Sequence, residues 1–295
     1  MNPRVLLLFG AGASAHSEPP GVKMPPMGDG LFTELKATGN IPANLPLDVL
    51  NEFAKPGGFE DGMAKLAALD SSKYTPFLRG MAKYFASFLP TADSHYVKLF
   101  AAFKASQSQA FIATLNYENL IEHALIKAGC NPSGVIKPHG SCGYLLQLDP
   151  TSTYRDIVSF GPAGTTFFEA NPLIELDPGK IRQWCDDANR SSFAPAMSFY
   201  AAGKHTPINA RQIEVQRDEW ERLAQQVEVC FVIGVRCNEA DDHIWAPLAA
   251  SSCRLIYVNP SDAGFAQWLK NRSRRNAEHR KAGLADVIRE ILSET

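Results

Sequence analysis

Short apolar runs recur along this chain, and each of them stops abruptly at a glycine or at polar residues. The first run fills residues 4–9 and passes directly into Gly10. Its five consecutive apolar residues are too few for a buried helix and are typical of a central strand in a parallel sheet covered on both faces. Comparable runs predict further strands at residues 109–114, 134–137, 228–233 and 255–258.

Between the first two of these strands the hydrophobic period changes to that of a helix. Residues 31–106 are dominated by helical spacing, and the clearest stripe places large side chains on one face at i, i+4, i+7, i+8 and i+11. That stripe consists of Phe77, Met81, Tyr84, Phe85 and Phe88. Ser94 is predicted to cap a further helix that turns its aromatic residues inward. Because such stripes are typical of a core, we expect a helical insert over residues 29–108.

The alternation of strands and helices predicts a Rossmann-like α/β fold, a doubly wound parallel sheet with a helical insert or small second lobe. We expect a single domain over residues 1–295, closed by helices at 210–226 and 284–292. Residues 145–225 are expected to form a second insert, irregular or helical, with one candidate strand at 196–200. Its turn signals are Asp149-Pro150, Gly161-Pro162 and Asp177-Pro178-Gly179.

Composition removes several classes of function. The 295 residues carry a formal net charge of -2, which argues against general attraction to nucleic acid or to a membrane surface. A basic run at residues 270–280 is predicted to be a solvated helix face. The six cysteines include no Cys-x-x-Cys pair, so no structural zinc site is expected. Without a leader or a long apolar run, the chain is expected to work in the reducing cytoplasm.

The turn after the first strand is the first candidate for chemistry. Its sequence is Gly10-Ala11-Gly12-Ala13-Ser14. Small residues at the end of a strand let backbone N–H groups approach an anionic pyrophosphate, although Gly-Ala-Gly also serves as a simple turn. Residues 18–30, which hold four prolines and three glycines, are predicted to form a long loop beside this turn. That loop is a candidate lid or binding segment, with a plain connector as the alternative.

Polar side chains follow the next two predicted strands. Asn116 and His139 come directly after them, and we expect the two to meet near Gly10 because ligands bind at strand ends near the switch in strand order. The alternatives are that Asn116 caps the following helix and that His139 is a turn histidine bonded to backbone.

Three neighbouring candidates are given structural roles. His16 is interpreted as a loop residue, and Cys142 as a small buried thiol. Asp241-Asp242-His243 resembles a metal cluster, but adjacent residues splay apart on a helix or strand, so no metal site is predicted.

Taken in order, the strand-end motifs resemble those of the sirtuin superfamily. They are Gly10-Ala11-Gly12-Ala13-Ser14, Thr114-Leu115-Asn116-Tyr117-Glu118, Lys137-Pro138-His139-Gly140-Ser141, Ile233-Gly234-Val235 and Val258-Asn259-Pro260. The resemblance covers residues 4–143 and 228–262, and its order and spacing are more specific than any one motif. It implies a doubly wound sheet that binds NAD at the ends of its strands.

The resemblance also implies a role for each matched residue. The pyrophosphate of NAD would lie on Gly10, Ala11, Gly12 and Ser14, and Gly234 and Asn259 would follow the adenosine half. Asn116 would lie against the nicotinamide ribose, and Thr114 in the same motif would also bind the cofactor. His139 would act as the base.

The sequence departs from the pattern of the deacylating sirtuins at several positions. The four-cysteine zinc module is missing, Leu115 and Glu118 replace the usual glutamine and aspartate, and no Pro-x-Phe-Arg is recognisable in residues 18–30. Peptide recognition is therefore in doubt. The stretch from Thr114 to Glu118 is more similar to the sirtuin-like NADases of prokaryotic antiphage defence.

The resemblance thus implies an NAD glycohydrolase, or NADase, an effector that cleaves NAD to nicotinamide and ADP-ribose or cyclic ADP-ribose. NAD is then a substrate, with no metal needed. The alternatives are an NAD-dependent protein deacylase or ADP-ribosyltransferase, and a sensor that binds NAD or ADP-ribose without turnover. Control of such an enzyme would come from a homo-oligomer or a regulatory partner, such as a HerA-type ATPase or an Argonaute-type protein.

Overall fold

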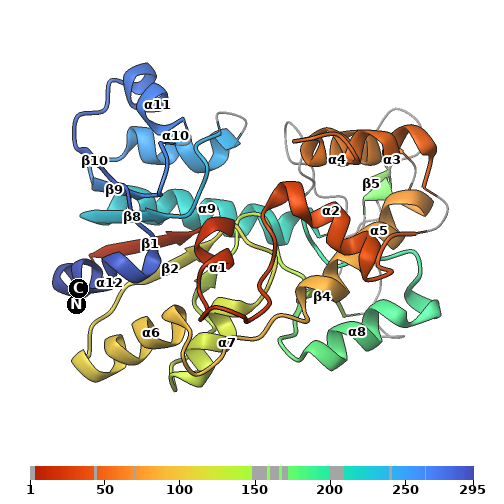
Figure 1. Cartoon of the computed structure of the whole chain (residues 1–295), viewed down its shortest axis with the longest axis horizontal. Coiled ribbons are helices and arrows are strands. Elements are labelled where there is room, and N and C mark those ends of the chain that lie inside the picture. Colours follow the sequence, from red (N-terminus) through yellow and green to blue (C-terminus); the bar gives the residue numbers. More distant parts are fainter. Residues whose placement is uncertain are drawn as a thin grey trace.

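The predicted apolar runs form one parallel sheet at the centre of the molecule. The computed structural model describes residues 4–42, 45–69, 71–147, 158–159, 166–167, 172–198, 209–238, 241–262 and 264–295. The sheet has six strands in the order β10-β9-β8-β1-β2-β3, and every neighbouring pair is parallel (Figure 1). Their bounds are β1 Val5–Phe9, β2 Phe111–Thr114, β3 Val135–Ile136, β8 Val229–Ile233, β9 Arg254–Val258 and β10 Ala277–Arg280.

This strand order confirms the doubly wound prediction. The chain leaves β1 toward β2 and β3, then returns to the other side of β1 and continues through β8, β9 and β10. The strand order therefore changes direction between β1 and β8. Ligands bind at such a switch point, beyond the carboxyl ends of the strands.

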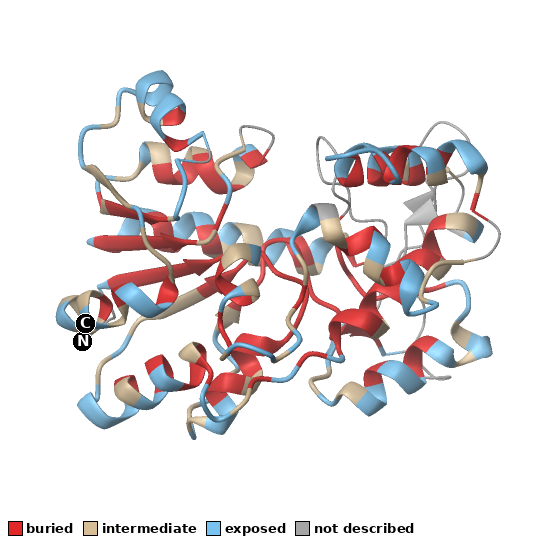
Figure 2. Ribbon diagram, viewed as in Figure 1, coloured by how far each residue is buried: buried red, intermediate tan, exposed pale blue. Residues whose placement is uncertain are grey.

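Helices cover both faces of the sheet. Alternate β1 side chains divide between them, since Leu7 and Phe9 join one core cluster while Leu6 and Leu8 join another. The first face carries α6 His95–Ser106, α7 Leu120–Lys127 and α12 Leu284–Glu294. The second carries α9 Ala210–Gln226, α10 Asp242–Ala250 and α11 Phe265–Arg272. Strands β1 and β8 at the centre of the sheet are buried along their whole length, and the helices turn pale, exposed faces outward (Figure 2).

The prediction for the basic run at residues 270–280 was wrong. Only its first part belongs to α11, and Ala277–Arg280 forms the edge strand β10, paired with β9 from Leu255 to Val258. All four β10 residues are half-buried. A short edge strand with charged side chains lacks the apolar run that reveals a buried strand.

Beside the sheet lies a group of helices that precedes β2 in the chain (Figure 1). It comprises α2 Gly28–Ala37, α3 Leu47–Phe53, α4 Phe59–Ala67 and α5 Ser71–Phe85. Stacked rings hold it together: the centroids of Phe32 and Phe53 are 4.4 Å apart, and those of Phe53 and Phe77 are 5.4 Å apart. The predicted stripe from Phe77 to Phe88 is buried as expected.

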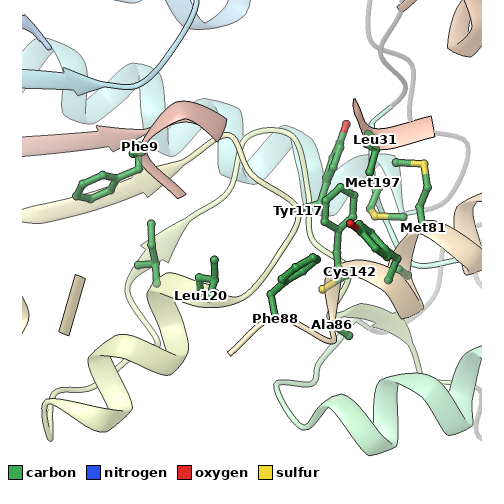
Figure 3. Packing of buried hydrophobic residues seen from close by; sticks show 14 of the residues in the cluster. Phe9, Leu31, Met81, Ala86, Phe88, Tyr117, Leu120, Cys142 and Met197 are labelled. Carbon is green, nitrogen blue, oxygen red and sulfur yellow. The ribbon is translucent and has the colours of Figure 1, made fainter. Parts of the chain in front are cut away.

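One hydrophobic cluster continues from the sheet into this helical group. Figure 3 shows Phe9 and Leu120 toward the sheet, Met81 and Phe88 toward the helices, and Tyr117 between them. All five side chains are buried. The division into a single domain with inserts at 29–108 and 145–225 stays a prediction.

The second predicted insert is more regular than its turn signals suggested. It contains β4 Tyr144–Leu146, β7 Pro172–Ile174, α8 Pro178–Asp186 and the 3-10 turn Ala188–Arg190, and β5 Val158–Ser159 pairs with β6 Thr166–Phe167. The candidate strand at 196–200 is represented by a single bridge between Met197 and Gly140, and residues 199–200 lie outside the described part. So do the predicted turns Asp149-Pro150 and Gly161-Pro162. Across the described ranges, no helix has the length and hydropathy that crossing a bilayer requires.

Candidate active site

The turns after β1 and β8 are packed directly against each other at the switch point. The Gly10 N–H donates to the Ile233 carbonyl at 2.9 Å, and the Gly12 N–H donates to the Gly234 carbonyl at 2.9 Å. Gly234 has a φ of +64°, and a Cβ there would lie 2.1 Å from the Ala13 nitrogen. Both the conformation and the close approach therefore require glycine at this position.

The segment after β1 is a short helix and not an open loop, which corrects the prediction for it. Helix α1 spans Ala11–Ala15, with Gly10 at its N-cap. The N–H groups of Gly10 and Gly12 donate to carbonyls of the β8 turn, so these glycines contribute to the packing of the two turns against each other. The Ala11 amide is at the first helical position, where a helix provides no internal partner.

Ser14, near the end of α1, contacts three polar side chains in the buried edge of the sheet. Its hydroxyl donates to Glu118 Oε1 at 2.6 Å, accepts from Asn116 Nδ2 at 2.9 Å, and lies 3.0 Å from the Tyr96 hydroxyl. Ser14 is 1% exposed and Asn116 is 7% exposed. Ser14 therefore connects the glycine turn to the end of β2.

The hydrogen-bond donors and acceptors around Ser14 determine the orientation of the Asn116 side-chain amide. When Glu118 is ionised its carboxylate only accepts hydrogen bonds, so the single Ser14 proton goes to Glu118 and the Asn116 amide turns its NH₂ group toward Ser14. The Oδ1 atom is then the acceptor that Asn116 presents to a ligand or water. The Asn116 backbone N–H is also held, at 3.1 Å from the hydroxyl of Thr114. The helix-cap alternative for Asn116 is wrong, because the N-cap of α7 is Asn119.

A buried lysine joins the end of β2 to the end of β3. Lys137 Nζ donates to the Glu118 carbonyl at 2.6 Å, to Asn119 Oδ1 at 3.2 Å and to Glu122 Oε1 at 2.9 Å. The Lys137 side chain is 1% exposed. Burial raises the pKa of the Glu118 carboxyl, while the Ser14 hydrogen bond and the Lys137 charge oppose that rise.

His139 follows β3 and is buried. The next residue, Gly140, has a φ of +85°, and a Cβ there would lie 2.1 Å from the Ala196 carbonyl oxygen. That close approach lets the Ser198 N–H donate to the His139 carbonyl at 2.9 Å. The His139 ring turns elsewhere, and its Nε2 atom lies 2.9 Å from Nε2 of His243.

The structure thus brings together some of the predicted site residues and adds others. Asn116 and His139 follow neighbouring strands, but Asn116 is bonded to Ser14 and the His139 ring to His243. Asp241 completes a group with the two histidines, and the potential ligand atoms of the three residues all lie within 4.8 Å of one another.

The expectation that residues 241–243 splay apart holds for Asp242, whereas Asp241 and His243 lie together beside His139; the prediction that no metal binds there stays a prediction. Asp242 turns outward, where its Oδ1 accepts from Arg272 at 3.0 Å. Asp241 and His243, two positions apart at the start of α10, both reach His139. The run Asp241-Asp242-His243 is visible in the sequence, but only the fold shows that β3 ends opposite the start of α10.

Asn259 lies at the end of β9, on the far side of the switch point. Its Nδ2 donates to the Val235 carbonyl at 3.3 Å, and its Oδ1 accepts from the Ser261 N–H at 3.1 Å. Asn259 and Gly234 therefore shape the β8 and β9 turns along the predicted adenosine side. Their contact with a nucleotide stays a prediction.

The proline-rich segment lines a cleft of about 550 Å³ beside α1. Its walls come from Ala15, His16 and most of residues 18–27, so His16 is a lining residue as well as the C-cap of α1. Glu18 anchors the segment by accepting from the Thr91 N–H at 3.1 Å. The segment ends at Gly28, where α2 begins, slightly before the predicted end of the loop. Asn116 and His139 are not among the described lining residues, so this cleft opens beside the strand-end site.

Cys142 is a buried thiol, as predicted. It is fully buried, and burial raises the pKa of its thiol. A thiol in this state is not a ready nucleophile. All six cysteines are free.

The sheet and its flanking helices have the Sir2 Rossmann-like α/β fold. A crystal structure of a Sir2 homologue in complex with NAD is 17% identical, with a TM-score of 0.51, over 98% of this chain and 88% of that chain. A point mutant of a Sir2 homologue in complex with ADP-ribose is 16% identical, with a TM-score of 0.50, over 98% and 90% of the two chains. No protein-family profile and no curated protein matches the sequence. At these identities the likeness establishes the fold.

Proposed function

We propose that this chain binds NAD across the carboxyl edge of its sheet and hydrolyses the bond between nicotinamide and ribose. The observation that carries the proposal is the Ser14–Asn116 hydrogen bond, which fixes an amide beside the glycine turn at the switch point. Solved Sir2 homologues of the same fold hold NAD or ADP-ribose, which supports the choice of ligand.

The two packed turns support a placement for NAD. The pyrophosphate lies near Gly10, where α1 begins and its first amide has no partner within the helix. The adenosine half extends over Gly234 and Asn259, at the ends of β8 and β9. The nicotinamide ribose then reaches toward the ends of β2 and β3, where Asn116 and His139 lie.

The chemistry requires a held ribose and a delivered water. Departure of nicotinamide gives an oxocarbenium-like ribose, as in glycoside hydrolysis. Asn116 Oδ1 accepts from a ribose hydroxyl or from water without adding charge. His139 takes the proton as the nucleophile forms, once its Nε2 atom is released from His243. General-base assistance of this kind contributes about 10²- to 10⁴-fold, and positioning adds further rate.

The product is ADP-ribose or its cyclised form, together with nicotinamide. The similarity of residues 114–118 to the antiphage NADases supports a defence role, in which depletion of NAD harms the infected cell. Such an activity needs control, which we assign to self-association or to a regulatory partner protein.

Nicotinamide release from NAD tests this proposal and separates it from its rivals. The purified chain is incubated with NAD, with and without an acylated peptide. We expect peptide-independent release that is lost in Asn116→Ala and His139→Ala and retained in His95→Ala, a half-buried histidine outside the strand-end site. Release that requires the peptide would identify a deacylase, and equal activity in Asn116→Ala and wild type would refute the site.

A further inference from the structure

The group His139, Asp241 and His243 is not explained by NAD cleavage alone. Two imidazole nitrogens face each other at 2.9 Å, and a carboxylate completes a set of ligand atoms within 4.8 Å. His139 and Asp241 are buried and His243 is half-buried. A carboxylate near a histidine base can orient its ring, but a base that accepts a proton at Nε2 does not need a second imidazole nitrogen facing that same atom.

The dimensions of the group fit a metal centre after small side-chain rotations. A tetrahedral ion bonded at about 2.0–2.2 Å keeps its nitrogen and oxygen ligands roughly 3.3–3.5 Å apart. The two nitrogens would separate slightly from 2.9 Å, and the carboxylate would approach from within 4.8 Å. Both movements are of the size that rotation about side-chain bonds supplies.

The backbone presents the three groups from two places, the turn after β3 and the start of α10. His139 is held after β3 by the Ser198 hydrogen bond to its carbonyl, and Asp241 and His243 are held by the start of α10. The intervening Asp242 is turned outward to Arg272. The selection of positions 241 and 243 over 242 thus comes from the conformation of the chain.

We propose that His139, Asp241 and His243 form a binding site for a divalent transition-metal ion of the Zn²⁺ class. Imidazole nitrogen suits Zn²⁺, Fe²⁺ and Ni²⁺, whereas Mg²⁺ and Ca²⁺ prefer oxygen ligands. Three protein ligands leave at least one coordination position open for water or another small ligand.

The proposed ion competes with the proposed catalytic role of His139. A metal bond at Nε2 uses the lone pair that would otherwise take a proton. Binding of Zn²⁺ therefore silences the base, which makes the site inhibitory. This consequence rests on the proposed NAD cleavage, but the metal site itself does not.

Binding of Zn²⁺ to the full chain in the absence of NAD tests the site directly. A chromogenic chelator competes for Zn²⁺ with wild type, His243→Ala, Asp241→Asn and the matched neighbour Asp242→Asn. Because loss of a supporting group alone costs about 10–100-fold in metal affinity, loss of a ligand should weaken binding at least that much. We expect this loss of Zn²⁺ affinity in His243→Ala and Asp241→Asn, and an unchanged affinity in Asp242→Asn. Circular dichroism of each variant confirms that the fold is retained.

A second measurement identifies the ligands and keeps the site distinct from the activity. Co²⁺ bound by histidine and carboxylate should give visible absorption bands in wild type and Asp242→Asn but not in His243→Ala. Equal Zn²⁺ affinity and equal Co²⁺ spectra in wild type and His243→Ala would overturn the metal site. If Zn²⁺ binds to His139, Asp241 and His243 but leaves nicotinamide release unchanged, the proposed inhibitory role is wrong. An absence of nicotinamide release without metal would contradict the proposed function and leave the binding result intact.

Discussion

Replacement of Ser14 by alanine is the most direct perturbation of the strand-end site. The hydroxyl takes part in three contacts, with Glu118 at 2.6 Å, Asn116 at 2.9 Å and Tyr96 at 3.0 Å. Each buried hydrogen bond contributes a net of about 0.5–1.5 kcal/mol, so Ser14→Ala should lower the free energy of unfolding by about 2–4 kcal/mol. The Glu118 carboxyl that would lose its partner is buried, which favours the upper part of that range.

Thermal and chemical denaturation measure this loss. For a chain of this size we expect the midpoint temperature to fall by about 3–6 °C, with an unchanged dependence on denaturant. Ser106→Ala is the matched control, because that hydroxyl is bonded locally to Ala102 and to its neighbours at the exposed end of α6. Equal stability of Ser14→Ala and Ser106→Ala would refute the hydrogen-bond network described above.

Three further predictions follow from the same region. Asn116→Ala should lower nicotinamide release at least about 10²-fold while the fold remains intact, because the variant removes the fixed amide. Gly234→Ala should destabilise the chain by about 2–5 kcal/mol in urea unfolding, since it combines a left-handed backbone with a steric clash. Glu118→Gln should gain stability over wild type as pH rises above the ordinary glutamate value of 4.5, because burial raises the pKa of Glu118 and the folded state binds that proton more tightly.

Each of these predictions has its own control. Gly57→Ala has a similar φ of +69° with open space around the new Cβ, so it isolates the backbone contribution of Gly234→Ala. A cost for Gly57→Ala as large as that of Gly234→Ala would show that the turns are not tightly packed. A midpoint difference between Glu118→Gln and wild type that does not change between pH 4 and pH 8 would contradict the raised pKa. Unfolding of Asn116→Ala would assign that residue a structural role.

The central strands could be predicted because their apolar runs are local and continuous. The strands near 4–9, 109–114, 134–137, 228–233 and 255–258 are all present in the sheet. Edge strand β10 could not be found in this way, because its half-buried residues Ala277–Arg280 carry no apolar run.

Helix α8 was missed for a different reason. Asp177-Pro178-Gly179 was interpreted as a turn, whereas Asp177 Oδ1 caps the helix by accepting from the Lys180 N–H at 2.9 Å. An aspartate followed by proline at the first helical position is also a helix-start signal. The same three residues are therefore compatible with a turn and with a helix start. In the structure they begin α8, which packs against α5 Ser71–Phe85.

The candidate site likewise contains some features that local motifs predict and others that only the fold shows. Small residues after β1 and polar residues after β2 lie in local motifs, so the proximity of Ser14 and Asn116 could be expected from strand order. The facing of His139 and His243 depends on how α10 follows β8, which no local pattern reports. The glycines were recognised, but their use in packing the β1 and β8 turns becomes visible only when both turns are placed.

The structure of the chain in complex with NAD tests the central claim most directly. We predict that the pyrophosphate lies at the start of α1 beside Gly10 and that the nicotinamide ribose lies within hydrogen-bonding distance of Asn116, with His139 facing the same ribose. NAD bound elsewhere, with its ribose away from Asn116, or a chain that binds no NAD at saturating concentration, would contradict the account.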